Sequence, residues 1–247
     1  MKNYKFVIQY EGTRYQGWQR QITTDQTIQG KLESILTRMT GKKVEISASG
    51  RTDAGVHALG QVANAHMETD RSCSEILNYV NQYLPEDIAI IQVEEVDERF
   101  HARLWASEKT YLYRVVCSEI PHVFDRRYVL MHPEYLDVER MKSAARLLTG
   151  THDFMGFSTA KKTKKSTVRT VYEIGIEQSG DEIRLCYRGD GFLYHMVRIL
   201  TGTLLEVGRG ERSPESVLEI FESRNRERAG ELVPAKGLTL VEVRYEK

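Results

Sequence analysis

The stretch Ala48-Ser-Gly-Arg-Thr-Asp-Ala-Gly-Val-His57 (ASGRTDAGVH) places an ionisable Arg-Thr-Asp triplet between apolar segments, on a loop that glycine makes tight. An aspartate followed by Ala-Gly is favourable turn chemistry, so Asp53 by itself is more often a turn residue than a catalyst. The alternative is a carboxylate presented for a reaction, with Arg51 near enough to keep it ionised. The rest of the chain decides between these two interpretations.

The composition is that of a folded globular chain. Its 247 residues are 40% hydrophobic and 28% charged, which suits one large domain or two small ones. Apolar runs too short for a bilayer and an N-terminus without a signal-peptide pattern predict a soluble cytoplasmic protein with no membrane partner. Three widely separated cysteines and seven scattered histidines favour neither a disulfide framework nor a metal site.

The charges are balanced in number but unevenly distributed along the chain. A net charge of zero speaks at first against a nucleic-acid partner. However, residues 86–98 hold six acidic side chains and no basic one, whereas residues 154–170 hold five basic side chains and no acidic one. A neutral total can therefore conceal a polarised surface that binds a polyanion.

The hydrophobic pattern predicts two halves, with the element orders β-α-β-β-α-β and β-α-β-β-α-α-β. Such repeated runs of strands and helices favour an α+β protein with two similar lobes, divided near residues 100–108. The predicted strands are 4–10, 44–48, 62–67, 88–93, 111–116, 168–178, 182–188 and 238–245. The predicted helices are 28–39, 72–84, 137–148, 192–207 and one that begins at Pro214, with a loop at 151–158.

One arginine stands on a helix whose other positions are mostly apolar. Arg198 closes the string Phe192-Leu-Tyr-His-Met-Val-Arg198 and is followed by Ile199 and Leu200. A solvated helix face is the simple explanation, but apolar neighbours on both sides disfavour it. A buried arginine requires an anionic partner, so Arg198 is a candidate for pairing with a functional carboxylate.

Several motifs, taken together and in this order, resemble the tRNA pseudouridine synthase I (TruA) family along the whole chain. GRTDAGVHA is a long string and is far more specific than a short glycine motif. The segments that carry the resemblance are YEGTRYQGWQRQ (10–21), TIQGKLE (27–33), SGRTDAGVHALGQV (49–62), RFHAR (99–103), KTYLYRV (109–115), GTHDFMGFS (150–158), GDGFLYHMVRILTGTLLEVGRG (189–210) and PAKGLTLVEVRY (234–245).

The resemblance implies an α+β fold of two ferredoxin-like lobes. The lobes share a continuous, mainly antiparallel sheet with helices packed on one face, and the active-site cleft lies between them. We expect an N-terminal lobe over residues 1–104, which carries the aspartate loop, and a C-terminal lobe over 105–247. The family enzymes are homodimers that hold one tRNA across both subunits and modify uridines 38, 39 and 40 of the anticodon stem-loop.

The resemblance also assigns roles to five residues. Asp53 matches the catalytic aspartate, and Arg51 matches the arginine that assists extrusion of the target nucleotide. Tyr111 matches the tyrosine that stacks on the target uracil. Arg198 matches the arginine that pairs with the catalytic aspartate, and Leu238 matches an apolar residue of the pocket wall.

Basic residues outside these motifs are candidate phosphate contacts, because double-stranded RNA is recognised mainly by shape and phosphates. The candidates are Arg14, Arg20, Lys161, Lys162, Lys164, Lys165 and Arg169. The lysine run fits a solvated loop equally well, and Trp18 fits either a stacking contact with RNA or a buried position. The residues Glu231-Leu-Val before Pro234 depart from the smaller or more polar approach that we expect there.

The chemistry explains why an aspartate is needed. Conversion of uridine to pseudouridine breaks the C1′–N1 bond, turns the uracil and joins C5 to C1′, without redox change, so we expect no metal and no small-molecule cofactor. A carboxylate suits as nucleophile, because it attacks and also leaves readily. Attack on uracil C6 and attack on ribose C1′ both remain open.

Two other functions remain as alternatives to a tRNA-uridine isomerase. One is a non-catalytic tRNA-binding or RNA-folding protein of the same fold, for which the set of Asp53, Arg51, Tyr111 and Arg198 has no evident use. The other is an aspartate-dependent glycosidase, which in its retaining form needs a second carboxylate about 5–5.5 Å away. No such partner is evident in the sequence.

Overall fold

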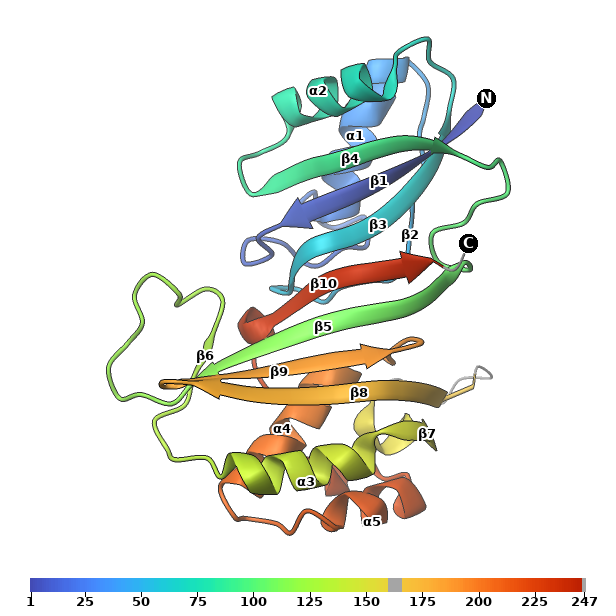
Figure 1. The fold of residues 1–247 in the computed structure, drawn as a ribbon. Coiled ribbons are helices and arrows are strands. Elements are labelled where there is room, and N and C mark those ends of the chain that lie inside the picture. Colours follow the sequence, from blue (N-terminus) through green and yellow to red (C-terminus); the bar gives the residue numbers. More distant parts are fainter. Residues whose placement is uncertain (160–165, 246–247) are drawn as a thin grey trace. The chain divides into compact units, whose positions relative to one another are not determined.

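The protein, seen in a computed structural model, is described over residues 1–159 and 166–245 (Figure 1). Backbone contacts divide it into two compact units, Met1–Ser107 with Thr239–Lys247, and Glu108–Leu238. The predicted division at 104/105 lies three residues before the observed one. The prediction also placed the last strand in the C-terminal lobe, whereas it belongs to the first unit. That strand returns to the first unit because it pairs in parallel with the strand that begins at His57.

The first unit contains a sheet in the order β4-β1-β3-β10. Its strand β1 is antiparallel to both β3 and β4. The helix α1 crosses behind β1 and β4 in Figure 1, and α2 packs against both α1 and β4. The elements are β1 (Lys2–Tyr10), α1 (Ile28–Thr40), β2 (Ser47–Ala48), β3 (His57–Met67), α2 (Cys73–Tyr83), β4 (Ile88–Val96) and β10 (Leu238–Tyr245).

Local sequence signals account for the ends of the two helices in this unit. The hydroxyl of Thr27 accepts a hydrogen bond from the backbone N–H of Gly30 and so caps α1. Gly41 ends the same helix at φ 70°, the left-handed conformation that glycine adopts at no steric cost. Ser72 and Glu75 form a reciprocal capping box at the start of α2. All of these ends agree with the sequence pattern.

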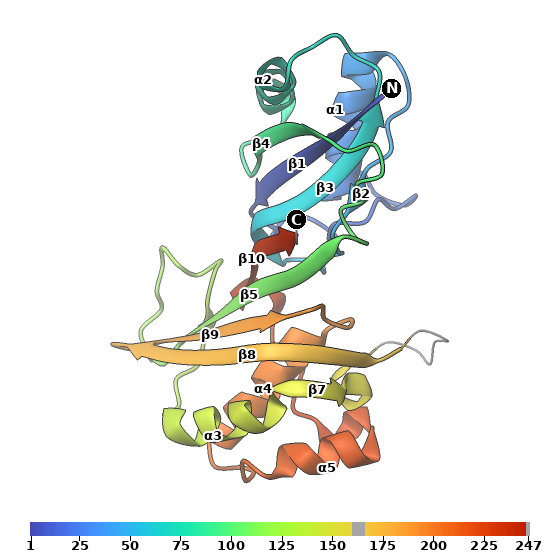
Figure 2. The same ribbon diagram turned by 45° about the vertical axis from the view of Figure 1, so that its right-hand side comes forward.

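The second unit contains a sheet in the order β5-β9-β8-β7, in which each strand is antiparallel to the next, and the short strand β6 pairs in parallel with β5. Helices α3, α4 and α5 lie on one side of β8 and β9 in both views (Figures 1 and 2). The predicted α+β class is thus confirmed. The elements are β5 (Ala106–Val116), β6 (Leu130–Met131), α3 (Val138–Leu148), β7 (Gly150–Asp153), a 3₁₀ turn (Phe154–Phe157), β8 (Val168–Ser179), β9 (Glu182–Gly189), α4 (Met196–Gly208) and α5 (Ser216–Ser223).

The strand expected at 111–116 begins already at Ala106, and three further predicted boundaries in the second unit are wrong. The helix expected from residue 192 begins at Met196, because His195 has φ 64°, which a right-handed helix does not allow. The helix expected from Pro214 begins at Ser216, after a turn in which the N–H of Ser216 bonds the carbonyl of Ser213. The predicted loop at 151–158 is mostly β7 and the 3₁₀ turn, which Asp153 caps by accepting from the N–H of Met155.

One predicted strand of the first unit is shorter than expected and others are longer, among them the strand expected at 88–93, which runs to Val96. The strand expected at 44–48 is reduced to Ser47–Ala48, while the strand expected at 62–67 extends back to His57. Along the described ranges, no helix has the length and apolar character needed to cross a lipid bilayer.

Candidate active site

The loop that carries Asp53 is held at its start by a buried glutamine of β3. Gln61 is fully buried, and its Oε1 accepts a hydrogen bond of 2.7 Å from the hydroxyl of Ser49. Its Nε2 donates a 3.0 Å hydrogen bond to the carbonyl of Gly50. A buried amide with both ends satisfied is a rigid support, because breaking either bond would leave a polar atom without a partner.

The residue before Asp53 is fixed on both its side chain and its backbone. The Thr52 hydroxyl lies 2.7 Å from the buried Tyr10 hydroxyl, and burial raises the pKa of Tyr10 to about 12, which keeps that group protonated. The carbonyl of Thr52 accepts a 3.0 Å hydrogen bond from the N–H of Trp18. The position of the Asp53 backbone is therefore set by the core of the first unit.

Asp53 itself closes a turn and keeps a partly exposed side chain. Its carbonyl accepts a 3.2 Å hydrogen bond from the N–H of Val56, so the turn chemistry expected of Asp-Ala-Gly is present. The Asp53 side chain is half-buried, and the neighbouring Arg51 is exposed, with no hydrogen bond or ion pair to the rest of the described chain. Turn formation thus occupies the backbone of Asp53 and does not exclude a chemical role for its carboxylate.

A second loop, from Gly12 to Trp18, packs directly beneath this turn. A Cβ atom added to Gly17 would lie 2.8 Å from the carbonyl oxygen of Thr52 and 3.2 Å from the carbonyl carbon of Asp53. Trp18 is only 2% exposed, so of its two predicted positions the buried one is confirmed. Close approach of two backbones explains why glycine stands at position 17.

We expect Gly17→Ala to lower kcat by about 10- to 100-fold, because a displacement of about 1 Å at a reacting group costs that much. The matched control is Gly41→Ala, since both glycines have positive φ but no atom lies within 4 Å of a Cβ at Gly41. Both variants should lose about 1–2 kcal/mol of stability from backbone strain. Steady-state rates and thermal unfolding measure the two effects, and equal rates in the two variants would contradict the packing argument.

Tyr111 lies on β5 of the second unit, opposite Tyr187 of β9. Its ring meets the edge of Phe192 at a centroid distance of 5.3 Å and an interplanar angle of 86°. The Tyr111 side chain is 9% exposed. Contact with Phe192 fixes the plane of the Tyr111 ring, which is the requirement for a stacking platform.

Arg198 of α4 bonds the start of the segment 233–238 in the same unit, and Leu238 is the last residue of that segment. The Nε of Arg198 donates a 2.8 Å hydrogen bond to the carbonyl of Val233, and the Tyr113 hydroxyl donates a 2.7 Å bond to the carbonyl of Pro234. Burial raises the pKa of Tyr113, although the charge of Arg198 opposes this effect. The side chain of Leu238 is 5% exposed.

Of the unexpected residues before Pro234, Val233 serves packing. Val233 is fully buried, so an apolar residue there fills the core of the second unit. Gly230 donates its N–H to the hydroxyl of Thr203 on α4, and a Cβ at Gly202 would lie 2.0 Å from the carbonyl oxygen of Glu231. The segment therefore follows α4 closely and places Val233 beside Arg198.

Two of the predicted phosphate contacts are held in ion pairs. Arg14 pairs with Asp87 at 2.6 Å, and Arg20 pairs with Glu33 at 2.7 Å, where both carboxylates are largely buried. Nη1 of Arg169 donates to the backbone carbonyls of residues 166 and 168. The remaining candidates, Lys161, Lys162, Lys164 and Lys165, lie outside the described residues.

The assigned residues are divided between the two units, with Asp53 and Arg51 in the first and Tyr111, Arg198 and Leu238 in the second. Sequence reasoning missed the residues that support them, notably Gln61, Gly17 and Phe192. All three stand inside motifs that carried the family resemblance, which was the only signal available for them. Within residues 1–159 and 166–245, no group of three His, Cys, Asp or Glu side chains is arranged to hold a metal ion.

Comparison with known proteins gives one consistent result. The family model described as tRNA pseudouridine synthase matches residues 6–103 and 144–246. The protein described as tRNA pseudouridine synthase A in Bacillus sp. (strain KSM-64) is 50% identical over 242 residues, 97% of this chain and 98% of that protein. The one described as tRNA pseudouridine synthase A 2 in Bacillus cereus (strain ZK / E33L) is 45% identical over 245 residues, 99% of this chain and all of that protein.

Among solved structures, the crystal structure of the archaeal box H/ACA sRNP Nop10-Cbf5 complex resembles the chain with a TM-score of 0.36 and 12% identity. That match covers 82% of this chain and 43% of the other. The likeness is too weak to support a conclusion.

Proposed function

The chain belongs to the tRNA pseudouridine synthase family, and we propose that it isomerises uridine to pseudouridine at positions 38, 39 and 40 of the tRNA anticodon stem-loop, with Asp53 as nucleophile. The observation that carries the proposal is the fixed backbone around Asp53, combined with a carboxylate that keeps partial exposure. A nucleophile must be rigidly placed and still reachable. Membership of an isomerase family excludes the glycosidase alternative.

The reaction is balanced without any external reagent. The carboxylate of Asp53 adds either to uracil C6 or to ribose C1′, the C1′–N1 bond breaks, and the uracil turns while it stays bound to the enzyme. A new bond then joins C5 to C1′, and the carboxylate is released. One proton leaves C5 and one is gained at N1, so the product is an isomer of the substrate.

The other assigned residues supply what the carboxylate cannot. The target uridine must leave its stack, at a cost of a few kcal/mol, and we assign that step to Arg51. Stacking on the Tyr111 ring offsets part of the cost, since such a contact contributes about 1–3 kcal/mol per base. Arg198 provides the positive charge that keeps the nucleophile ionised in a closed site, and Leu238 excludes water beside the base.

We also propose that the enzyme acts as a homodimer in the cytoplasm, with one tRNA held across two subunits. The family resemblance supports this assembly. The size of the substrate supports it as well, because a tRNA is much longer than a single binding pocket. Light scattering of the protein with and without tRNA tests it, with two chains per tRNA as the expected stoichiometry.

The decisive experiment for the reaction uses tRNA that carries tritium at C5 of its uridines. An isomerase releases tritium to water in step with formation of pseudouridine at positions 38, 39 and 40, which chemical mapping of the same tRNA locates. A protein that only binds or folds tRNA releases none, and that result would overturn the proposal.

Tyr111→Ala is expected to lower kcat/KM by about 10- to 100-fold, which corresponds to the loss of one base-stacking contact. Tyr111→Phe keeps the ring and its edge contact with Phe192, so it separates stacking from any role of the hydroxyl. Full activity in the phenylalanine variant assigns Tyr111 to stacking alone. Equal loss in both variants assigns the effect to the hydroxyl and would contradict the platform role.

A further inference from the structure

Helix α1 buries a polar pair where its hydrophobic pattern predicts only apolar contacts. Gln29 and Glu33 are 8% and 4% exposed, and they lie one helical turn apart. The Nε2 of Gln29 donates a 2.8 Å hydrogen bond to Oε1 of Glu33. A buried carboxylate is costly unless several donors satisfy it, so this pair requires an explanation in terms of what it holds.

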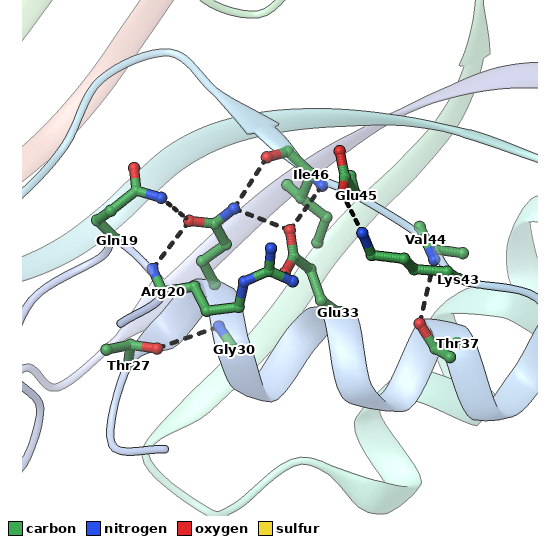
Figure 3. A network of polar contacts seen from close by, with 11 residues as sticks. Gln19, Arg20, Thr27, Gly30, Glu33, Thr37, Lys43, Val44, Glu45 and Ile46 are labelled. Atoms are coloured by element: carbon green, nitrogen blue, oxygen red, sulfur yellow. Dashed lines mark hydrogen bonds and ion pairs between the residues drawn. The ribbon is translucent and has the colours of Figure 1, made fainter. Parts of the chain in front are cut away.

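The pair binds the segment that follows Trp18 (Figure 3). The Oε1 of Gln29 accepts from Nε2 of Gln19 at 2.7 Å and from the backbone N–H of Arg20 at 2.9 Å. The Oε2 of Glu33 accepts from Nη1 of Arg20 at 2.7 Å. A charge-assisted bond of this kind is about twice as strong as a neutral one.

The same carboxylate also binds the chain just before β2. The Oε1 of Glu33 accepts a 3.0 Å hydrogen bond from the backbone N–H of Ile46, and Gln29 donates to the Ile46 carbonyl at 3.3 Å. Ile46 lies three residues ahead of Ser49, where the aspartate loop begins. Gln29 and Glu33 therefore bind two segments beside the aspartate loop, namely residues 19–20 and the chain at Ile46.

Backbone hydrogen bonds carry the connection onward to the aspartate. The N–H of Gln29 donates to the carbonyl of Trp18 at 3.0 Å, and the N–H of Trp18 donates to the carbonyl of Thr52, also at 3.0 Å. Thr52 is covalently joined to Asp53. A displacement of residues 17–20 thus reaches the nucleophile through a single hydrogen bond and one peptide unit.

We propose that Gln29 and Glu33 are positioning residues for Asp53, and that Arg20 is the cation that completes their clamp rather than a free phosphate contact. The proposal rests on the proposed function of Asp53 as nucleophile. The clamp holds residues 17–20 against α1, and these residues in turn hold Thr52. Replacement of Glu33 by glutamine leaves the Arg20 guanidinium facing a neutral amide. The weaker contact releases residues 17–20, and no cavity forms because the side chain keeps its size.

Glu33→Gln is the variant that tests the clamp, since it keeps the size of the side chain and removes its charge. We expect kcat for tritium release to fall about 10- to 100-fold, as for a nucleophile displaced by about 1 Å, while KM for tRNA stays nearly constant. Rates are measured well below the unfolding temperature and expressed per folded molecule. A loss that disappears after this correction would overturn the proposal, because it would reflect stability alone.

The matched control is Asp25→Asn. Asp25 forms an exposed ion pair of 3.0 Å with Lys31, which also joins α1 to the preceding loop but touches neither Gln29 nor Glu33. The control should keep the wild-type kcat. A comparable loss in both variants would overturn the specific role of the buried pair.

Arg20→Gln distinguishes a clamp from a phosphate contact. We expect it to lower kcat as Glu33→Gln does, and the double variant to be little worse than either single one, since coupled residues are not additive. A raised KM with unchanged kcat would instead identify Arg20 as a contact to the tRNA phosphates and would overturn the clamp.

Amide hydrogen exchange tests the clamp without any reference to turnover. In Glu33→Gln the N–H groups of Trp18 and Arg20 should exchange at least about tenfold faster, while those of β1 and β3 remain protected. Unchanged exchange at these two amides overturns the inference even if the wild-type protein proves inactive. Absence of tritium release from the wild-type protein contradicts only the proposed reaction, so the two failures are distinguishable.

Discussion

Asp53→Asn is expected to abolish formation of pseudouridine while leaving the affinity for tRNA nearly unchanged. Asparagine has the shape of aspartate, but its amide oxygen is a poor nucleophile and carries no charge. Removal of a nucleophile from an enzyme that uses covalent catalysis lowers kcat by about 10⁴-fold or more. Tritium release from labelled tRNA measures the rate, and equilibrium binding of the same tRNA measures the affinity.

The fold of the loop should survive this substitution. Side-chain contacts of Ser49, Thr52 and Gln61 hold the loop, and the carbonyl of Asp53 still accepts from Val56 in the variant. The loss of activity can therefore be assigned to the carboxylate itself. Asp53→Ala, which cannot revert to aspartate by deamidation, should behave in the same way.

Asp70→Asn provides the matched control, because Asp70 is an exposed carboxylate of the same unit. It should retain full activity. If the Asp53 variants still convert uridine at a substantial fraction of the wild-type rate, Asp53 is not the nucleophile and the proposed mechanism is wrong.

Regular hydrophobic alternation explains why much of the fold could be predicted from the sequence. In β1 the side chains of Phe6 and Ile8 are buried while Val7 between them is half-buried, as a period of two requires. Thr27 and Gly41 act at the ends of α1 as their residue types suggest. Such signals are local, so they can be read without knowledge of distant neighbours.

Boundaries that depend on tertiary contacts could not be predicted. His195 takes a left-handed conformation at the start of α4, and its Nδ1 lies 2.7 Å from the hydroxyl of Thr159. No local rule anticipates that conformation for a histidine between tyrosine and methionine. The return of the last strand to the first unit likewise depends on pairing with β3, a contact between opposite ends of the chain.

The buried face of α1 shows the same limit within the candidate site. Periodicity places Ile35 and Met39 on the inner face, yet both are half-buried, whereas Gln29 and Glu33 are buried. Because Gln29 and Glu33 form hydrogen bonds with residues 19, 20 and 46, the buried face of α1 includes these polar side chains and differs from the face that periodicity predicts. Residue patterns singled out Asp53 and Arg198 as candidates, the family resemblance assigned the roles of Asp53, Tyr111 and Arg198, and these roles stay predictions.

Arg198→Ala is expected to lower kcat by about 10²- to 10⁴-fold, because removal of one partner from a charge pair that bound tRNA closes off from water costs about 3–5 kcal/mol and each 1.36 kcal/mol is a factor of ten. The proposed partner is the carboxylate of Asp53. Arg198 also anchors the segment before Leu238, through its hydrogen bond to the Val233 carbonyl. A single alanine variant therefore removes a charge and an anchor together.

Two further substitutions separate these contributions. Arg198→Lys keeps the positive charge but replaces the planar fork with a point charge, whereas Arg198→Gln keeps a donor for the Val233 carbonyl and removes the charge. If the charge supports the nucleophile, activity ranks lysine above glutamine, and glutamine close to alanine. The opposite ranking assigns Arg198 to anchoring and contradicts its pairing with Asp53.

A control and a rescue complete the test. The guanidinium of Arg140 on α3 also donates hydrogen bonds to backbone carbonyls, those of Val207 and Arg212. Arg140→Gln therefore measures the effect of losing such contacts at a position outside the candidate site, and it should leave kcat unchanged. Methylguanidinium at concentrations too low to denature the protein should restore part of the activity of Arg198→Ala, because the truncation leaves room for it where the guanidinium of Arg198 stood. It should not restore Arg198→Gln, whose side chain fills that space, and restoration of both variants alike would show that the added cation acts elsewhere, for instance on the tRNA phosphates.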